Sequence, residues 1–231
     1  MIRNQPNTCS YCGVKANTRD HVPSKNLLEK PFPINLLTIP SCDKCNNSYS
    51  LDEEYFLNVL VEVSENPTLM SKKRIGGSVF KARERSKGLK ERIEDSLIQS
   101  EDGMLYFQSE SDRIKRVIEK NAFGLFYHRY KIFPNLRDFK CSGFYPFSVK
   151  ETRPSDALLL AFTDKFKPKR WTVMQKNVFS YIVVRDWRRE KGLTMILYLH
   201  NTTWCIIEIP YPHRRAKLLK YSSGQLPLFA R

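Results

Sequence analysis

The 231-residue sequence has no long hydrophobic run. None of its apolar stretches approaches the ~18 residues that a helix needs to cross a bilayer. The first twelve residues, MIRNQPNTCSYC, also lack the apolar segment of a secretory signal peptide. We therefore expect a cytoplasmic protein with no membrane contact. Since 41% of its residues are hydrophobic, the chain can still bury a sizeable core.

Acidic residues are scarce relative to basic ones, with 24 Asp or Glu against 39 Lys or Arg and a formal net charge of +15. Residues 61–231 hold 33 basic and 18 acidic side chains, whereas residues 1–60 are balanced. A strongly basic body indicates a polyanionic partner. Nucleic acid fits better than a membrane surface, because no basic amphipathic helix with an aromatic face is visible. A basic solvated surface without a partner is the alternative interpretation.

Only six cysteines are present, and a disulfide framework is not expected in a chain of this size without a signal peptide. Four of them form two C-x-x-C pairs, which are Cys9 with Cys12 and Cys42 with Cys45. Together these pairs can supply four thiolates to one Zn²⁺, which leaves no open coordination position and predicts a structural metal. Redox thiols are the alternative. The lone Cys141 and Cys205 are interpreted as buried small hydrophobes.

Helical patterns occupy the first two thirds of the chain. Ser50 followed by Glu53 has the spacing of a capping box at a helix start. The acids Asp52, Glu53 and Glu54 are interpreted as a charged first turn that the helix dipole favours. Apolar residues at helical spacing predict a second helix over residues 111–130.

The last third of the chain changes character. Its stretches FSYIVVRDW, TMILYLH and TWCIIEIP are rich in β-branched and aromatic residues, with turn residues between them. This pattern predicts a small antiparallel sheet over about residues 170–210.

A polar string, TRDHVPSK, lies between the two cysteine pairs, and Asn46 follows the fourth cysteine directly. If one metal ties the pairs together, Asn46 comes close to Asp20 and His21. Carboxylate and amide oxygens are ligands suited to Mg²⁺ or Mn²⁺. A neighbouring imidazole can then deprotonate a water molecule, so the three residues can hydrolyse a phosphodiester.

The order C-x-x-C, D-H-x-P, N-L and C-x-x-C-N resembles the zinc-containing ββα-metal branch of the HNH endonuclease superfamily, which includes the phage recombination endonuclease VII. The resemblance covers about residues 8–56. It implies that Asp20 and Asn46 are ligands of the catalytic metal and that His21 is the general base. It also implies that Asn35 pins the loop and orients His21. A prokaryotic or phage-encoded role in antiviral defence or restriction follows from the resemblance alone.

Lysines and arginines cluster after the cysteine module, as expected for side chains that neutralise DNA phosphates without reading sequence. The densest cluster includes Lys72, Lys73, Arg74, Lys81, Arg83 and Arg85. Because no recognition helix or finger array is visible, we expect weak sequence specificity. Control by a regulatory or targeting protein partner is then expected, since an unspecific nuclease would harm its host.

The end of the chain carries a short hydrophobic peptide after a Ser-Ser-Gly break. It resembles the Gln-Leu-x-Leu-Phe peptides by which bacterial DNA-processing proteins bind the replication sliding clamp. The corresponding residues are Gln225, Leu226, Leu228 and Phe229. The alternative is a tail that packs its Leu and Phe side chains on its own core.

Taken together, the patterns predict an α+β protein that is a metal-dependent HNH endonuclease acting on DNA. A non-catalytic zinc-finger protein that binds nucleic acid is the alternative. The expected regions are a ββα-metal module at 1–62, a basic helical region at 63–135, an α+β region with an antiparallel sheet at 136–215, and a flexible tail at 216–231.

Overall fold

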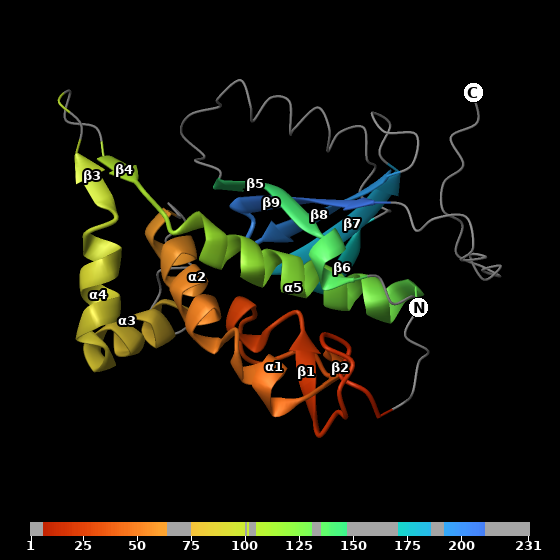
Figure 1. Cartoon of the computed structure of the whole chain (residues 1–231). Coiled ribbons are helices and arrows are strands. Elements are labelled where there is room, and N and C mark those ends of the chain that lie inside the picture. Colours follow the sequence, from red (N-terminus) through yellow and green to blue (C-terminus); the bar gives the residue numbers. More distant parts are fainter. Residues whose placement is uncertain are drawn as a thin grey trace, which may run out of the picture.

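The computed structural model describes residues 7–63, 75–99, 101, 105–130, 135–146, 171–185 and 192–210. Within these ranges the chain combines helices with antiparallel strands, which confirms the expected mixture (Figure 1). None of the described helices is long and apolar enough to cross a membrane.

The N-terminal part is a β-hairpin followed by two helices. Its elements are β1 (Thr18–Val22), the 3-10 helix η1 (Lys25–Leu27), β2 (Leu37–Ser41), α1 (Asp43–Asn47) and α2 (Ser50–Val63). β1 and β2 are antiparallel, with Asp20 opposite Ile39 and His21 opposite Thr38. The helix start predicted at Ser50 is confirmed, and the shorter helix α1 precedes it at the second cysteine pair.

A helical arm follows α2. It consists of α3 (Ile75–Arg85) and α4 (Lys87–Glu94), and then a short hairpin of β3 (Leu97–Gln99) and β4 (Leu105–Phe107). Ser86 caps α4, because its side chain accepts a hydrogen bond from the backbone N–H of Leu89. The arm lies beside α2 at one end of the molecule (Figure 1).

The long helix α5 (Ser111–Tyr130) is the central element of the fold, and its bounds match the predicted range. It crosses the middle of the molecule, with the sheet on one side and the hairpin and α1 on the other (Figure 1). Gly124 allows the hairpin to approach closely. A Cβ at that position would lie 2.6 Å from Cγ2 of Val22.

The C-terminal sheet has five antiparallel strands in the order β5-β9-β8-β7-β6. They are β5 (Lys140–Pro146), β6 (Thr172–Gln175), β7 (Phe179–Arg185), β8 (Gly192–Leu199) and β9 (Thr203–Pro210). The sheet predicted over 170–210 is therefore confirmed, and β5 joins it at the β9 edge. Cys141 and Cys205 are buried as expected, and burial raises the pKa of both thiols.

One hydrophobic core joins the hairpin, α2, α5 and the sheet. Val22 and Ile39 of the hairpin, Phe56 of α2, Phe123 of α5 and Leu197 of β8 all belong to it and are almost fully buried. The core therefore crosses the expected region boundaries at 62 and 135. As a result, the residues of the N-terminal module are held in place by α5.

Candidate functional site

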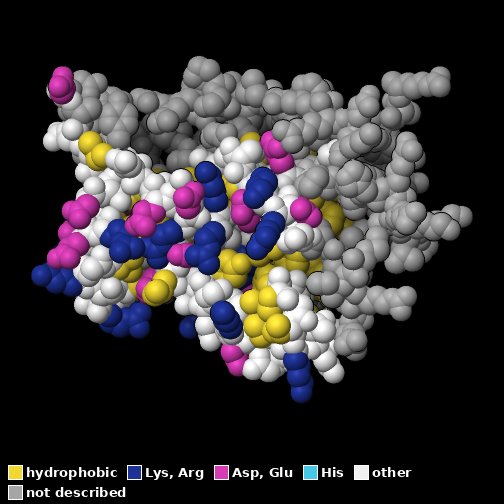
Figure 2. All heavy atoms as spheres, in the orientation of Figure 1, with side chains coloured by type: hydrophobic (Ala, Val, Ile, Leu, Met, Phe, Trp, Pro, Cys, Tyr) yellow, Lys and Arg dark blue, Asp and Glu magenta, His cyan; other side chains and the backbone are white. Residues whose placement is uncertain are grey.

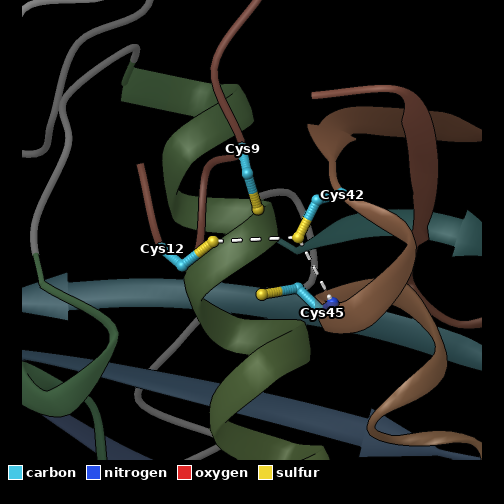
Figure 3. A group of neighbouring side chains, drawn as sticks. All are labelled: Cys9, Cys12, Cys42 and Cys45. Carbon is cyan, nitrogen blue, oxygen red and sulfur yellow. Dashed lines mark hydrogen bonds between the residues drawn. The ribbon is translucent and has the colours of Figure 1, made fainter. Parts of the chain in front are cut away.

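Four cysteine sulfur atoms meet beside the hairpin. The side chains of Cys9, Cys12, Cys42 and Cys45 point toward a common centre (Figure 3), and all four sulfur atoms lie within 4.8 Å of one another. The Sγ atoms of Cys12 and Cys42 are 3.8 Å apart. Because a tetrahedral centre with metal–sulfur bonds of about 2.3 Å has sulfur atoms about 3.8 Å apart, the group can hold one metal ion.

Local backbone structure prepares each cysteine pair. Gly13 has a φ of 77°, and this left-handed conformation closes the first knuckle with a hydrogen bond from its N–H to the carbonyl of Cys9. In the second knuckle, Cys42 is the N-cap of α1 and Cys45 lies in its first turn. Each pair is thus presented from a tight turn, as a chelating pair requires.

The protonation of the thiols depends on their position in the cluster. Burial acts to raise the pKa of Cys9, but hydrogen bonds from the backbone of Cys12, Cys42 and Tyr11 outweigh it and lower the pKa to about 7. Burial and the neighbouring thiols raise the pKa of Cys45. Four thiols at this spacing therefore do not all ionise by themselves, and a bound cation would displace their protons.

The cysteine knuckles bring α1 against β1. The backbone N–H of Ser10 donates to the carbonyl of Pro40 at 2.9 Å, and the N–H of Asp43 donates to Oδ1 of Asn17 at 3.0 Å. Asn46 then reaches β1 through a long hydrogen bond from Nδ2 to Oγ1 of Thr18, at 3.4 Å. Asn46 thus lies next to the strand that carries Asp20 and His21.

Asp20 points inward from β1 and is 5% exposed. One of its oxygens, Oδ2, accepts a hydrogen bond from Oη of Tyr11 at 2.7 Å and lies 2.9 Å from Nζ of Lys120. Burial and the Asp20 carboxylate raise the pKa of Tyr11 well above 10.0, which keeps the phenol a donor. Among the residues that the structure describes, none donates a hydrogen bond to Oδ1 of Asp20 or to Oδ1 of Asn46.

His21 extends from the opposite face of β1, because successive residues of a strand alternate. Its side chain is half-buried. Burial, together with the positive charges of Lys25 and Lys120, lowers its pKa below 6.5, against a smaller opposing effect of Asp20. The imidazole is therefore neutral at neutral pH and can accept a proton.

Asn35 lies in the turn that precedes β2, and its side chain is exposed. Within the described ranges it forms no hydrogen bond with His21. The role of Asn35 in orienting the imidazole stays a prediction.

A buried cluster of charges adjoins Asp20, and the sequence patterns did not indicate it. Lys120 of α5 is 2% exposed, and its Nζ lies 2.6 Å from Oε1 of Glu53 as well as 2.9 Å from Asp20. Ser24 Oγ donates to the same Glu53 oxygen at 2.6 Å. One signal was available: Lys120 lies three residues after Val117 and three before Phe123, on the predicted apolar face of the helix.

Asp52 and Glu53, in the first turn of α2, form ion pairs with α5, so their role is not limited to an interaction with the helix dipole. The capping box predicted for Ser50 and Glu53 is wrong, because the Glu53 carboxylate is engaged by Ser24 and Lys120. Asp52 is also buried, and it accepts hydrogen bonds from Arg113 at 2.7 Å and Arg116 at 2.6 Å. Both acids therefore tie α2 to α5.

The predicted phosphate-binding cluster is only partly described. Lys81 is exposed on α3, and the Arg85 side chain is 77% exposed, 3.8 Å from a Glu54 oxygen. Arg83 instead turns toward α2, where it donates to Asn58 at 2.7 Å and Glu62 at 2.9 Å. Figure 2 shows Lys and Arg side chains interleaved with Asp and Glu on this face.

The other members of the cluster and the tail peptide lie outside the described residues. These are Lys72, Lys73, Arg74, Gln225, Leu226, Leu228 and Phe229. Their predicted contacts with DNA and with the sliding clamp stay predictions.

Comparison of the chain with protein-family models, with curated proteins and with solved structures finds no match.

Proposed function

We propose that the protein is a metal-dependent endonuclease of the HNH type that hydrolyses DNA phosphodiester bonds. The observation that supports this function best is the position of Asn46. The cysteine cluster holds α1 so that Asn46 contacts β1 at Thr18, two residues before Asp20 on the same strand face. Two oxygen donors and the neutral imidazole of His21 thus belong to one short hairpin and the helix beside it.

The cysteine cluster is proposed as a structural zinc site. Its spacing suits four zinc–thiolate bonds, and four protein ligands leave no position for substrate. The zinc would fasten the two knuckles, and with them Asn46, to β1.

The catalytic metal, Mg²⁺ or Mn²⁺, would be held by the oxygens of Asp20 and Asn46 and would neutralise charge on the phosphate and the leaving oxygen. His21 accepts the proton of the attacking water, which its lowered pKa permits at neutral pH. Exposed basic side chains such as Lys81 and Arg85 would contribute non-specific attraction to phosphates.

Nicking of supercoiled plasmid DNA by the full-length, zinc-loaded protein tests this function. With Mg²⁺ or Mn²⁺ present, His21→Ala should slow cleavage by roughly 10²–10⁴-fold, the usual contribution of a general base. Asn46→Ala should weaken the response to metal, whereas the matched control Asn47→Ala, on the same helix but exposed, should not.

A non-catalytic zinc-finger protein that binds nucleic acid is the second candidate. The observation in its favour is that Tyr11 and Lys120 already satisfy Oδ2 of Asp20, as they would for an aspartate with a purely structural role. Wild-type protein that binds DNA but cuts no substrate with any divalent metal would establish this candidate and refute the nuclease.

A further inference from the structure

Lys120 is a buried cation for which the proposed reaction has no role. Lys is among the residues most rarely buried, because moving an ammonium group out of water is unfavourable unless partners replace the solvent. Here oxygen atoms replace the solvent. Nζ donates hydrogen bonds to Glu53 at 2.6 Å and to Ser24 at 3.4 Å, and it forms an ion pair with Asp20 at 2.9 Å.

The three oxygens come from different parts of the fold. Asp20 lies on β1, Ser24 directly precedes η1 and Glu53 lies in the first turn of α2, while Lys120 itself belongs to α5. Ser24 is fixed further, since its backbone N–H donates to Oδ1 of Asn121 at 2.8 Å. The ammonium position is therefore set by several elements at once, and it in turn fixes the Asp20 carboxylate.

The contacts of Asp20 are concentrated on one side. Tyr11 and Lys120 both bind Oδ2, which restricts rotation of the carboxylate, while no described residue donates to Oδ1. A carboxylate held by one oxygen presents the other in a constant direction. This is the form of support that metal ligands commonly receive from the residues behind them.

We propose that Lys120 is a positioning residue for the divalent-metal site: held by Glu53 and Ser24, its ammonium group fixes Asp20 so that the remaining oxygen is available to the metal. The inference rests on the proposed function in assigning Asp20 to that metal. Glu53 acts only through Lys120.

The test uses a double variant, Lys120→Met with Glu53→Gln, in the full-length zinc-loaded protein. Counting Asp20, Glu53 and Lys120 as ionised, the wild-type cluster carries one net negative charge, and so does the double variant. A difference in metal affinity between the two thus reports the lost contact to Asp20 and not a change of total charge. The double variant also avoids the unpaired second carboxylate that would weaken the fold of Lys120→Met alone.

Binding of Mn²⁺, followed by calorimetry and by the electron paramagnetic resonance of free Mn²⁺, is the primary measurement. Binding lost in Asp20→Asn identifies the relevant site. We expect the double variant to bind Mn²⁺ at this site at least tenfold more weakly than wild type, with zinc content unchanged. Lys115→Met, an exposed change on the same helix, should leave the affinity unaltered.

Equal or tighter Mn²⁺ binding by the double variant overturns the inference, because Lys120 would then be a purely structural cation or a competitor of the metal. Wild-type protein without an Asp20-dependent Mn²⁺ site overturns it as well. Plasmid cleavage tests the nuclease function separately from the role of Lys120 in metal binding. If Mn²⁺ binding changes as expected but the wild type never cuts DNA, Lys120 positions a metal ligand and the nuclease function fails. If the double variant cuts like wild type, the nuclease stands and the role of Lys120 does not.

Discussion

Removing the Lys120 ammonium group should destabilise the fold strongly, and removing the Glu53 charge as well should restore much of the loss. Nζ lies 2.9 Å from Oδ2 of Asp20 and 2.6 Å from Oε1 of Glu53, so the two carboxylate oxygens are at most about 5.5 Å apart. At an effective dielectric constant of about 20, their repulsion is then at least about 3 kcal/mol. Breaking a buried ion pair by deleting one partner typically costs about 3–5 kcal/mol. We therefore expect Lys120→Met to lower the free energy of unfolding by about 3–5 kcal/mol.

Urea denaturation of the zinc-loaded protein at neutral pH, followed by circular dichroism, measures this change. Adding Glu53→Gln to Lys120→Met should recover about 3 kcal/mol, because an uncharged amide then replaces the second buried carboxylate. Lys115→Met, exposed on the same helix, should change stability by no more than about 0.5 kcal/mol. A loss below about 1 kcal/mol for Lys120→Met, or a further loss on adding Glu53→Gln, would refute the reasoning.

Three other predictions concern the hairpin and its surroundings. Gly124→Ala should lower the free energy of unfolding by about 1–3 kcal/mol in urea denaturation, because its Cβ would lie 2.6 Å from Val22. Gly88→Ala, whose Cβ would meet open space, should instead raise it by about 0.5–1 kcal/mol, since alanine favours the helix. Equal effects of the two variants would contradict this packing. Lys25→Gln should raise the pKa of His21 toward 6.5 in a metal-free NMR titration, since it removes a positive charge that favours the neutral imidazole; an unchanged pKa would show that Lys25 has no such electrostatic effect. Zinc analysis should find about one ion per chain. Removal of the zinc by a chelator should abolish the protection of the hairpin amides from hydrogen exchange, whereas equal protection without metal would show that the hairpin does not need the metal.

Patterns with a clear period were predictable from the sequence. The 111–130 helix has Ile114, Val117 and Ile118 at helical spacing, and these side chains are indeed buried. The three C-terminal strands were also predictable, because β-branched and aromatic residues dominate them and turn residues separate them. The adjacency of the four cysteines followed from their paired spacing, since chelation needs them together.

The buried charges were not predictable in the same way. Charged side chains such as Lys120 and Glu53 are ordinarily assigned to solvent. The helical period does place Lys120 on the apolar face of its helix, but nothing local indicates that it will meet Glu53 across 67 residues of sequence. Their pairing depends on the way α2 packs on α5, which is decided by the core and not by either helix alone. The capping-box prediction at Ser50 and Glu53 failed for the same reason, since a tertiary ion pair outcompeted a local hydrogen bond.

The close approach at Gly124 has a consequence for how this chain can be divided. Val22 of the hairpin occupies the space that a side chain at position 124 of α5 would fill, and Asp20 pairs with Lys120 of the same helix. A fragment cut after residue 62 would carry the cysteines, Asp20 and Glu53, but it would leave Val22, Ile39 and Phe56 uncovered and the two carboxylates without Lys120. The N-terminal module is therefore not a portable unit: transplanted to another protein, it would have to bring α5 with it.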